Sequence, residues 1–392
     1  MKQAVIISAV RTPMGSLGGS LSLLPATKLG SIVIAEAMRR VNLKGDQVEE
    51  IIMGNVLSAA LGQAPARQAC LGAGLPRSVG CTTVNKVCGS GLKAVMLAAQ
   101  AVRLGDAEVV VAGGMESMSN APYLLMKARS GYRLGHGTLV DSLIKDGLWD
   151  VYNDFHMGAA AELCAEGFRI SREEQDQFAM VSYQRAQAAE RRGEFKKEIV
   201  PVTIPQRGNG EPIIDADEEV KKFDLKKLKT LRAVFKEGGT VTAGNASSIS
   251  DGAAAVVVVS EERALKLASE PLARIAGYSA VACDPEWFTI APVKAISSLM
   301  QKSGWTLGDV DLFEINEAFA ASSIAVNREL GLKREQVNIR GGAVALGHPI
   351  GASGARILTT LIHALTDLGK KRGVAALCIG GGEAVAMAVE RV

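Results

Sequence analysis

The stretch Val84-Asn85-Lys86-Val87-Cys88-Gly89-Ser90-Gly91 joins a short apolar segment to a helix-like run, Leu92 to Leu104, whose apolar residues recur with helical spacing. Its glycines allow the backbone to turn sharply and to approach a ligand closely. A cysteine at the start of a helix lies near unpaired N–H groups and the positive end of the helix dipole, and both favour the thiolate. The pattern therefore predicts a nucleophile at Cys88, although burial as a small apolar side chain is the more common role of a single cysteine.

The pattern around Cys88 recurs about 260 residues further along the chain. Ala352-Ser353-Gly354 corresponds to Gly89-Ser90-Gly91, and each stretch is followed by a helix-like run and then by an apolar strand that ends in two glycines. Upstream, residues 310–316 correspond to residues 48–55. Such a duplication predicts two α/β halves whose sheets are covered on both faces. We expect the halves to stack through a shared helix layer, which gives a five-layered α-β-α-β-α fold.

Residues 119–249 do not follow the strand–helix rhythm, and they are richer in charged, proline and aromatic residues. We expect them to form an inserted loop domain. The N-terminal α/β half then comprises residues 1–118 and 250–270, and the C-terminal half comprises residues 271–392. Within the insertion, Ser171-Arg172-Glu173-Glu174 is a capping box that predicts the start of a helix.

The composition excludes several classes of protein. The 392 residues suffice for two or three domains, 48% of them are hydrophobic, and a net charge of +3 favours neither nucleic acid nor a membrane surface as a partner. No apolar run approaches the roughly 18 residues of a membrane helix. Neither cysteines nor histidines have the spacing of metal ligands, so we expect no metal. We expect free thiols and a reducing, cytoplasmic location, because no Cys-x-x-Cys pair occurs among Cys70, Cys81, Cys88, Cys164, Cys283 and Cys378.

Four glycine-rich or strand-end turns carry reactive side chains, namely Cys88, Asn316, His348 and Cys378. Ligands of α/β sheets bind beyond strand ends, where such turns converge. His348 could serve Cys88 as a base, although a lone histidine is often structural. Asn316 could orient a water or donate to an oxyanion, and its alternative role is a helix N-cap. Cys378 ends a buried strand, but Gly380-Gly381-Gly382 leaves backbone N–H groups free near its sulfur.

These stretches resemble the thiolase family over the entire chain. A single glycine-rich match would be weak, whereas eight matches in the family's order are very specific. The matching stretches are Arg11-Thr12-Pro13, Asn85 to Gly91, Gly113-Gly114-Met115-Glu116-Ser117-Met118-Ser119, His156-Met157-Gly158, Val241-Thr242-Ala243-Gly244-Asn245-Ala246-Ser247, Asn316-Glu317-Ala318-Phe319-Ala320, Gly341 to Pro349 and Cys378-Ile379-Gly380-Gly381-Gly382.

The resemblance implies a duplicated thiolase fold and a ping-pong transfer between coenzyme A thioesters. Cys88 would attack an acyl-CoA while His348 takes its proton, and backbone N–H groups of Cys88 and Gly380 would hold the oxyanion. Cys378 would remove an α-proton from acetyl-CoA, with His348 and a water held by Asn316 stabilising the enolate. The expected reaction is the reversible condensation of two acetyl-CoA to acetoacetyl-CoA and CoA, without a cofactor.

The resemblance also implies that the loop domain holds coenzyme A. The lysines between Lys221 and Lys236 would suit its phosphates, although a solvated basic face is the default for such a run. Ser247 would contact the pantetheine amide, and His156 and Met157 would border the thioester. The residues expected to bind coenzyme A are Ser247, His156, Met157, Lys221, Phe235, Phe288 and Phe319.

Three alternatives to this reaction are considered. A 3-ketoacyl-CoA thiolase for longer chains in β-oxidation would share the chemistry, and the stretch Phe288 to Pro292 leaves the chain length open because many relatives are glycine-rich there. A decarboxylating ketosynthase-like enzyme would need no cysteine at position 378. A catalytically inactive acyl-CoA-binding module would not need Cys88, His348, Asn316 and Cys378 together.

The stretch Ser130 to Gly137 resembles the tetramerisation loop of biosynthetic thiolases. Apolar residues follow it at Leu139, Leu143 and Ile144 and need a partner surface. We therefore expect a homotetramer that is built from two dimers.

Overall fold

The strands form two half-sheets that meet at a short seam. The computed structural model describes residues 2–205 and 210–392, and within these residues one ten-stranded sheet has the order β14-β15-β16-β13-β1-β12-β5-β3-β4, with β2 paired to β12. At the seam, β1 and β13 pair at only two positions, Val5 with Arg274 and Ile6 with Ala273. The strands are β1 (Ala4–Arg11), β2 (Gly15–Ser16), β3 (Glu50–Gly54), β4 (Gly80–Val84), β5 (Val109–Ser117), β12 (Ser250–Ser260), β13 (Ala273–Ala282), β14 (Leu312–Ile315), β15 (Arg372–Ile379) and β16 (Glu383–Arg391).

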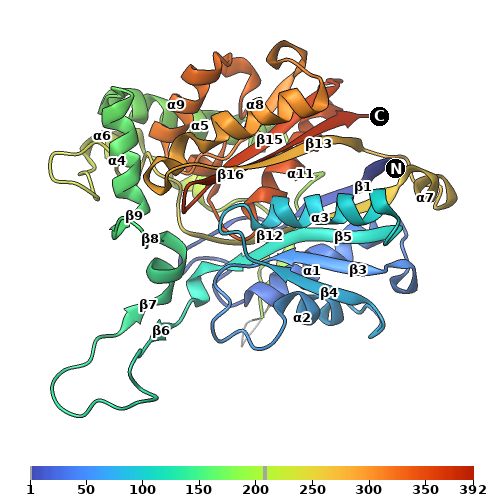
Figure 1. Ribbon diagram of the computed structural model, residues 1–392, viewed down its shortest axis with the longest axis horizontal. Helices are drawn as coiled ribbons and strands as arrows, with labels where there is room; N and C mark the ends of the chain where they lie inside the picture. The colour runs from blue at the N-terminus through green and yellow to red at the C-terminus, as the bar shows by residue number, and fades with distance from the viewer. Residues whose placement is uncertain (1, 206–209) are drawn as a thin grey trace.

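Helices separate the half-sheets and cover their outer faces (Figure 1). The middle layer contains α3 (Ser90–Leu104) and α11 (Ser353–Asp367), which pack on each other and on strands of both half-sheets. On the outer faces lie α1 (Ala26–Arg39) with α2 (Pro65–Gly72), and α8 (Ala291–Ser303) with α9 (Ala320–Leu330). The five-layered α-β-α-β-α prediction is confirmed.

The duplication is visible strand by strand. β3 and β5 pair in parallel in the first half, as β14 and β15 do in the second. In the first half β4 extends the sheet beyond β3, whereas the equivalent edge beside β14 has only a single bridge between Phe313 and Val337. The first half therefore carries one more strand, and this extra strand leads directly to Cys88.

The two middle helices touch at their first turns. A Cβ atom on Gly91 would lie 2.8 Å from the backbone N of Ala355, and one on Gly354 would lie 2.4 Å from the backbone N of Leu92. Real Cβ atoms do not approach backbone this closely, so both positions need glycine. Both glycines stand in a first helical turn, so the segments that precede the two helices meet here, and Cys88 packs against the cluster that contains Ile350.

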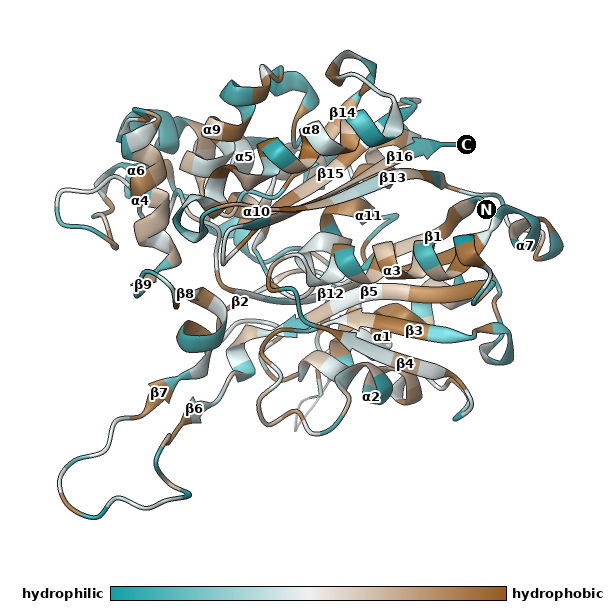
Figure 2. Ribbon diagram, viewed as in Figure 1, coloured by the Kyte–Doolittle hydropathy of each residue, from teal (hydrophilic) through white to brown (hydrophobic). Residues whose placement is uncertain are grey.

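The helix α3 is more apolar than the sequence analysis expected. The window Val87–Leu104 is long and apolar enough to cross a membrane by length and composition, so the expectation of no such run was wrong. In the fold this segment packs between the two half-sheets, and core helices of soluble proteins pass the same test. Figure 2 shows the matching pattern, with apolar residues concentrated along strands such as β5 and polar residues on the outer turns.

The segment between β5 and β12 forms short strands and helices that do not belong to the ten-stranded sheet. Its longest helix begins at the predicted capping box, where the Ser171 hydroxyl accepts from the N–H of Glu174 and the Glu174 carboxylate accepts from the N–H of Ser171. Figure 1 shows β6 and β7 leading into an arm that extends away from the body. The elements are β6 (Tyr123–Leu124), β7 (Val140–Asp141), the π-helix Leu143–Leu148, β8 (Trp149–Asp150), β9 (Phe155–His156), α4 (Met157–Gly167), α5 (Arg172–Arg191), β10 (Val202–Thr203), β11 (Ile213–Ile214) and α6 (Leu225–Thr230).

Short elements complete the chain. Two of them are α-helices, α7 (Glu261–Lys266) and α10 (Ala343–Leu346), of which α10 directly precedes the turn that carries His348. The others are 3-10 helices at Gly45–Gln47, Met118–Asn120, Glu219–Lys222, Pro285–Ile290, Leu307–Asp309 and Arg334–Gln336.

Candidate active site

Cys88 lies in a strained turn between β4 and α3. The preceding residue, Val87, has a φ of +45°, which is unusual for a β-branched side chain. The Ser90 hydroxyl holds this turn, because its oxygen accepts from the N–H of Lys86 (2.8 Å) and its proton goes to the carbonyl of Val87 (2.6 Å). The sulfur of Cys88 is half-buried and packs near Ile350, which follows His348. Strain of this kind is typical of functional turns.

The Cys88 sulfur is a thiol at rest. Burial raises its pKa to about 11, while the backbone N–H groups of Gly380 and of Cys88 itself act in the opposite direction. The expectation that the helix start favours the thiolate was therefore wrong, because desolvation outweighs these donors. The same two N–H groups lie where an oxyanion on an attached acyl group would form.

Cys378 lies at the end of β15 and is almost completely buried. Burial raises the pKa of its thiol far above the ordinary value, and the neighbouring Cys88 raises it further. Met157, Phe288 and Phe319 belong to the same apolar cluster as Cys378. Gly380 lies two residues after Cys378, beside Val87, and its backbone N–H lowers the pKa of Cys88.

His348 is held as a neutral ring. Its Nδ1 lies 2.6 Å from the hydroxyl oxygen of Ser353, whose own proton goes to the carbonyl of Pro349 at 2.9 Å. This pattern assigns the ring proton to Nδ1, so Nε2 keeps a lone pair that can accept a proton. Burial, and then the charge of Arg356, lower the pKa of His348 to about 3. A neutral imidazole beside a protonated thiol suits proton transfer during attack rather than before it.

Asn316 follows β14 and contacts the ring of His348. Its Nδ2 lies 3.4 Å from Nδ1 and 3.5 Å from Nε2 of His348, and its backbone N–H donates to the carbonyl of Ala376. Asn316 is not a helix N-cap, because α9 begins at Ala320 after Phe319. Within the described residues its buried Oδ1 accepts no hydrogen bond, so this oxygen is available to a substrate or a water.

Two buried glutamates were part of the quoted motifs but received no role from the sequence. The Glu116 carboxylate accepts from the N–H groups of Val56, Leu57 and Gly351, and burial raises its pKa to about 7. It thus fastens the loop after His348 to the N-terminal half. A carboxylate two residues after Gly113-Gly114, within an otherwise apolar strand, was the signal that could have identified it.

Glu317 performs a similar task in the C-terminal half. Its carboxylate accepts from the hydroxyl of Ser182, from Nδ2 of Asn338 and from the N–H of Val344. These contacts fix the residue beside Asn316 to α5 and α10. The side chain lies in the interior, and its position next to a polar motif residue was the only signal in the sequence.

Most residues expected to bind coenzyme A gather beside Cys378. His156 stacks on Phe235 with 4.8 Å between ring centroids, and Phe235 meets Phe319 edge-on at 6.3 Å. Ser247 donates its hydroxyl to the carbonyl of Ala318 at 2.9 Å. Met157 and Phe288 complete the apolar wall.

Lys221 lies apart from this group. It stands exposed at the short helix Glu219–Lys222, and its Nζ lies 3.8 Å from a carboxylate oxygen of Glu190. Lys222 pairs with Glu218 and Glu219, and Lys236 pairs with Glu166. The structure therefore distributes these lysines over carboxylates of the loop domain instead of gathering them at the aromatic group.

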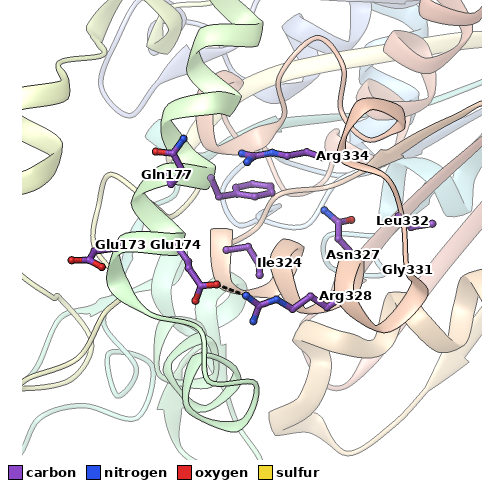
Figure 3. Close-up of a pocket in the computed structure, with 10 residues that line it drawn as sticks. Glu173, Glu174, Gln177, Ile324, Asn327, Arg328, Gly331, Leu332 and Arg334 are labelled. Atoms are coloured by element: carbon purple, nitrogen blue, oxygen red, sulfur yellow. Dashed lines mark hydrogen bonds and ion pairs between the residues drawn. The ribbon is translucent and has the colours of Figure 1, made fainter.

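A large surface hollow lies elsewhere, between α5 and α9 (Figure 3). Its wall includes Phe178, and the guanidinium of Arg334 lies 5.4 Å from the centroid of that ring. An ion pair between Arg328 and Glu174 also lines the hollow. None of its lining residues is Cys88, Cys378, His348 or Asn316. The reactive side chains therefore identify the site better than the size of a surface hollow does.

Comparisons with known proteins agree with this geometry. A family model described as thiolase, N-terminal domain, matches residues 4–262, and one described as thiolase, C-terminal domain, matches residues 269–391. The chain is 57% identical to acetyl-CoA acetyltransferase 2 of Arabidopsis thaliana over 99% of this chain and 97% of the relative. It is 54% identical to an acetyl-CoA acetyltransferase of Schizosaccharomyces pombe over 100% and 99% of the two chains.

A solved structure shows the same fold. The crystal structure of the acetyl-CoA acetyltransferase of Bacillus anthracis superimposes with a TM-score of 0.98 at 43% sequence identity, covering 100% of this chain and 99% of that one. With both family models matched in chain order and relatives similar over the full length, the chain belongs to the thiolase family.

Proposed function

We propose that this enzyme transfers an acetyl group between two molecules of acetyl-CoA, giving acetoacetyl-CoA and CoA, and runs the reverse thiolysis. The observation that carries the proposal is the end of the second half's strand β15, which bears Cys378 and lies against the turn of Cys88: a Cβ on Gly89 would lie 2.4 Å from Cδ1 of Ile379, and one on Gly380 would lie 3.9 Å from Cγ1 of Val87. The names of the full-length relatives, acetyl-CoA acetyltransferases, support the same activity.

The first half-reaction acetylates Cys88. Its sulfur attacks the thioester carbonyl while Nε2 of His348 takes the thiol proton, and the N–H groups of Cys88 and Gly380 receive the oxyanion. Coenzyme A leaves with the proton from His348. Because Cys88 is a thiol at rest, the acceptor on His348 is needed at the moment of attack.

The second half-reaction forms the carbon–carbon bond. Cys378 first gives its proton to Nε2 of His348 and then, as a thiolate, removes the α-proton of a second acetyl-CoA. The buried setting that raises its pKa makes that thiolate a strong base. Donors at His348 and at a water on Asn316 meet the enolate oxygen. The enolate carbon attacks acetyl-Cys88, and the expelled Cys88 sulfur takes the proton held on Nε2 of His348, so that Cys88, His348 and Cys378 all return to their resting states.

These steps use only side chains and backbone groups of the chain. We therefore propose that no cofactor takes part beyond the coenzyme A thioesters themselves. The aromatic group of His156, Phe235 and Phe319, with Ser247, is proposed to hold the pantetheine arm, and Lys221 to reach a phosphate from the loop domain. All six cysteines are free thiols, which supports a reducing, cytoplasmic location.

The acyl chain length is tested by rates of thiolysis. We expect acetoacetyl-CoA to be cleaved with a kcat/KM well above that of six- and eight-carbon 3-ketoacyl-CoA substrates, because Met157 and the buried Phe288 close the wall beside Cys378. Equal or higher values for the longer substrates would instead assign the enzyme to β-oxidation.

We also propose a homotetramer built from two dimers. Strand β4 is one of the two edge strands of the sheet within the described residues, and the arm after β6 exposes Leu125, Met126, Leu134 and Leu139. Leu143, which was expected to need a partner surface, is instead buried within its own chain, whereas Ile144 is partly exposed. Sedimentation at micromolar concentration should give a tetramer; a monomer would refute the assembly, and a stable dimer would reject only the role of the arm.

A further inference from the structure

An ion pair joins the two turns that bear reactive groups of the two halves. Lys86, two residues before Cys88, donates from its Nζ to a carboxylate oxygen of Glu383, the first residue of β16. The two side chains are only 24% and 36% exposed, so the pair is partly withdrawn from solvent. Among the residues that the structure describes, no other ion pair joins residues 84–91 to residues 378–384.

Lys86 is fixed within the turn of Cys88. Its backbone N–H donates to the hydroxyl of Ser90 at 2.8 Å, and its carbonyl accepts from the N–H of Gly89 at 3.0 Å. These two contacts close the backbone around Cys88. A pull on the Lys86 side chain therefore reaches the N–H group of Cys88 through a short, hydrogen-bonded loop.

Glu383 is fixed in the same way in the other half. It stands opposite Ile379 in the hairpin that β15 and β16 form. The turn of this hairpin contains Gly380 and then Gly381 and Gly382, whose φ angles are +90° and +85°. The N–H group of Gly380 therefore lies three residues from an ionic contact with the opposite half.

We propose that Lys86 and Glu383 are positioning residues for the acetylation of Cys88. The inference rests on the proposed function, in which the backbone N–H groups of Cys88 and Gly380 receive the oxyanion. One donor comes from each half, so the distance between the two donors depends on how the two turns lie against each other. Both donors must reach one oxygen atom at hydrogen-bond distance, and the ion pair is placed to hold the turns at that separation.

A second lysine–glutamate pair provides a matched control. Nζ of Lys2 lies 3.2 Å from a carboxylate oxygen of Glu108, and these side chains are 36% and 38% exposed. Glu108 directly precedes β5, and both β4 and β5 run parallel to β3, so Glu108 lies at the opposite end of the sheet from Cys88. Loss of this pair removes a similar attraction between partly exposed charges without touching the site.

The test follows the acetylation step with acetyl-CoA, by rapid acid quenching and mass spectrometry of the intact protein. We expect Glu383→Gln and Lys86→Met to be acetylated about 5- to 20-fold more slowly than wild type, a smaller loss than that of a whole oxyanion donor. Glu108→Gln should be acetylated at the wild-type rate. Exchange of acetyl-CoA methyl protons by the acetylated enzymes should be unchanged, because the enolate oxygen is proposed to meet His348 and a water on Asn316 instead.

The charge-swapped variant, Lys86→Glu with Glu383→Lys, should recover most of the lost rate, because the attraction between the two turns is restored. Melting temperatures show that each variant is folded. Acetylation of Glu383→Gln at the wild-type rate would overturn the proposal, and so would slow single variants that the swap does not rescue.

A parallel loss of acetylation and of proton exchange would also overturn it, because general damage to the site would then explain both. Wild-type protein that acquires no acetyl group would contradict the proposed function itself. The failure of this inference and the failure of the proposed function are therefore told apart by the wild-type reaction alone.

Discussion

Equivalent serines of the two halves hold different reactive groups through hydrogen bonds. In the N-terminal half, Ser90 fastens the strained turn of Cys88 through Val87 and Lys86. In the C-terminal half, the equivalent Ser353 fastens Nδ1 of His348 and the carbonyl of Pro349. One duplicated turn thus holds a nucleophile in the first half and its base in the second.

The two sulfurs differ in the same way. Cys88 is half-buried at a helix start with two N–H groups on its sulfur, whereas Cys378 is almost fully buried at a strand end among apolar residues. N–H donors next to the Cys88 sulfur can stabilise the oxyanion that forms when this sulfur attacks a thioester carbonyl. The apolar setting of Cys378 makes its thiolate a strong base. The difference indicates how one fold separates a nucleophile from an acid/base.

The largest expected effect is the loss of the nucleophile. Cys88→Ser should lower kcat by roughly four to six orders of magnitude, because acyl transfer then has no thiolate to form. Mass spectrometry after incubation with acetyl-CoA should show no acetyl group on peptide 87–93, with an unchanged melting temperature as the control for folding. An acetyl group on peptide 373–391 of the wild-type protein would reverse the roles of the two halves.

The next largest effect concerns Asn316 in the C-terminal half, whose bound water is proposed to donate to the enolate oxygen. Asn316→Ala should lower kcat for condensation by about 100- to 1,000-fold, as expected for one donor to an oxyanion. The KM should change little, since Asn316 contacts His348 rather than the aromatic wall. Steady-state kinetics in both directions measure this, and a rise in KM with an unchanged kcat would place Asn316 in ground-state binding instead.

A smaller effect is expected on stability at the crossing of α3 and α11. Gly354→Ala would place a Cβ 2.4 Å from the backbone N of Leu92, and relieving that overlap should lower the free energy of unfolding by about 3 kcal/mol. Gly105→Ala is no suitable control because Gly105 has a positive φ, whereas Gly308, with only Thr306 Oγ1 at 3.7 Å, has room for a Cβ. Urea unfolding of Gly354→Ala and Gly308→Ala gives the comparison, and equal losses would mean that the helices part easily.

The smallest effect concerns acid stability. The pKa of His348 is about 3 in the fold and about 6.5 in an unfolded chain, so between these values the unfolded state binds more protons. The contribution of neutral His348 to the free energy of unfolding is fully present above pH 6.5 and is lost as the pH falls toward 3. Between pH 6 and 4 the wild-type free energy of unfolding should fall more steeply than that of His348→Asn, by at most about 1.4 kcal/mol per pH unit. Parallel curves would mean that His348 is not buried as a neutral ring.

The sequence predicted the features that depend on local pattern. The duplication, the five layers and the helix at Ser171 follow from apolar periodicity, glycine turns and a capping box, and the structure has them. The thiol state of Cys88 was mispredicted, because burial is a property of the assembled fold and not of the turn. The links made by Glu116 and Glu317 also join distant segments, so the local pattern could mark these glutamates but could not identify their partners.

The separation of the two cysteines is tested most directly by the exchange of acetyl-CoA methyl protons with deuterated water, followed by NMR. Wild-type protein and Cys378→Ser are compared after Cys88 has been acetylated in each. The Cys378→Ser variant should still acquire acetyl on Cys88, and its exchange should be slower by orders of magnitude, because a serine hydroxyl is a much poorer base than a thiolate. Equal exchange in both proteins would contradict this separation and would assign the removal of the α-proton to another base, with His348 the first to examine.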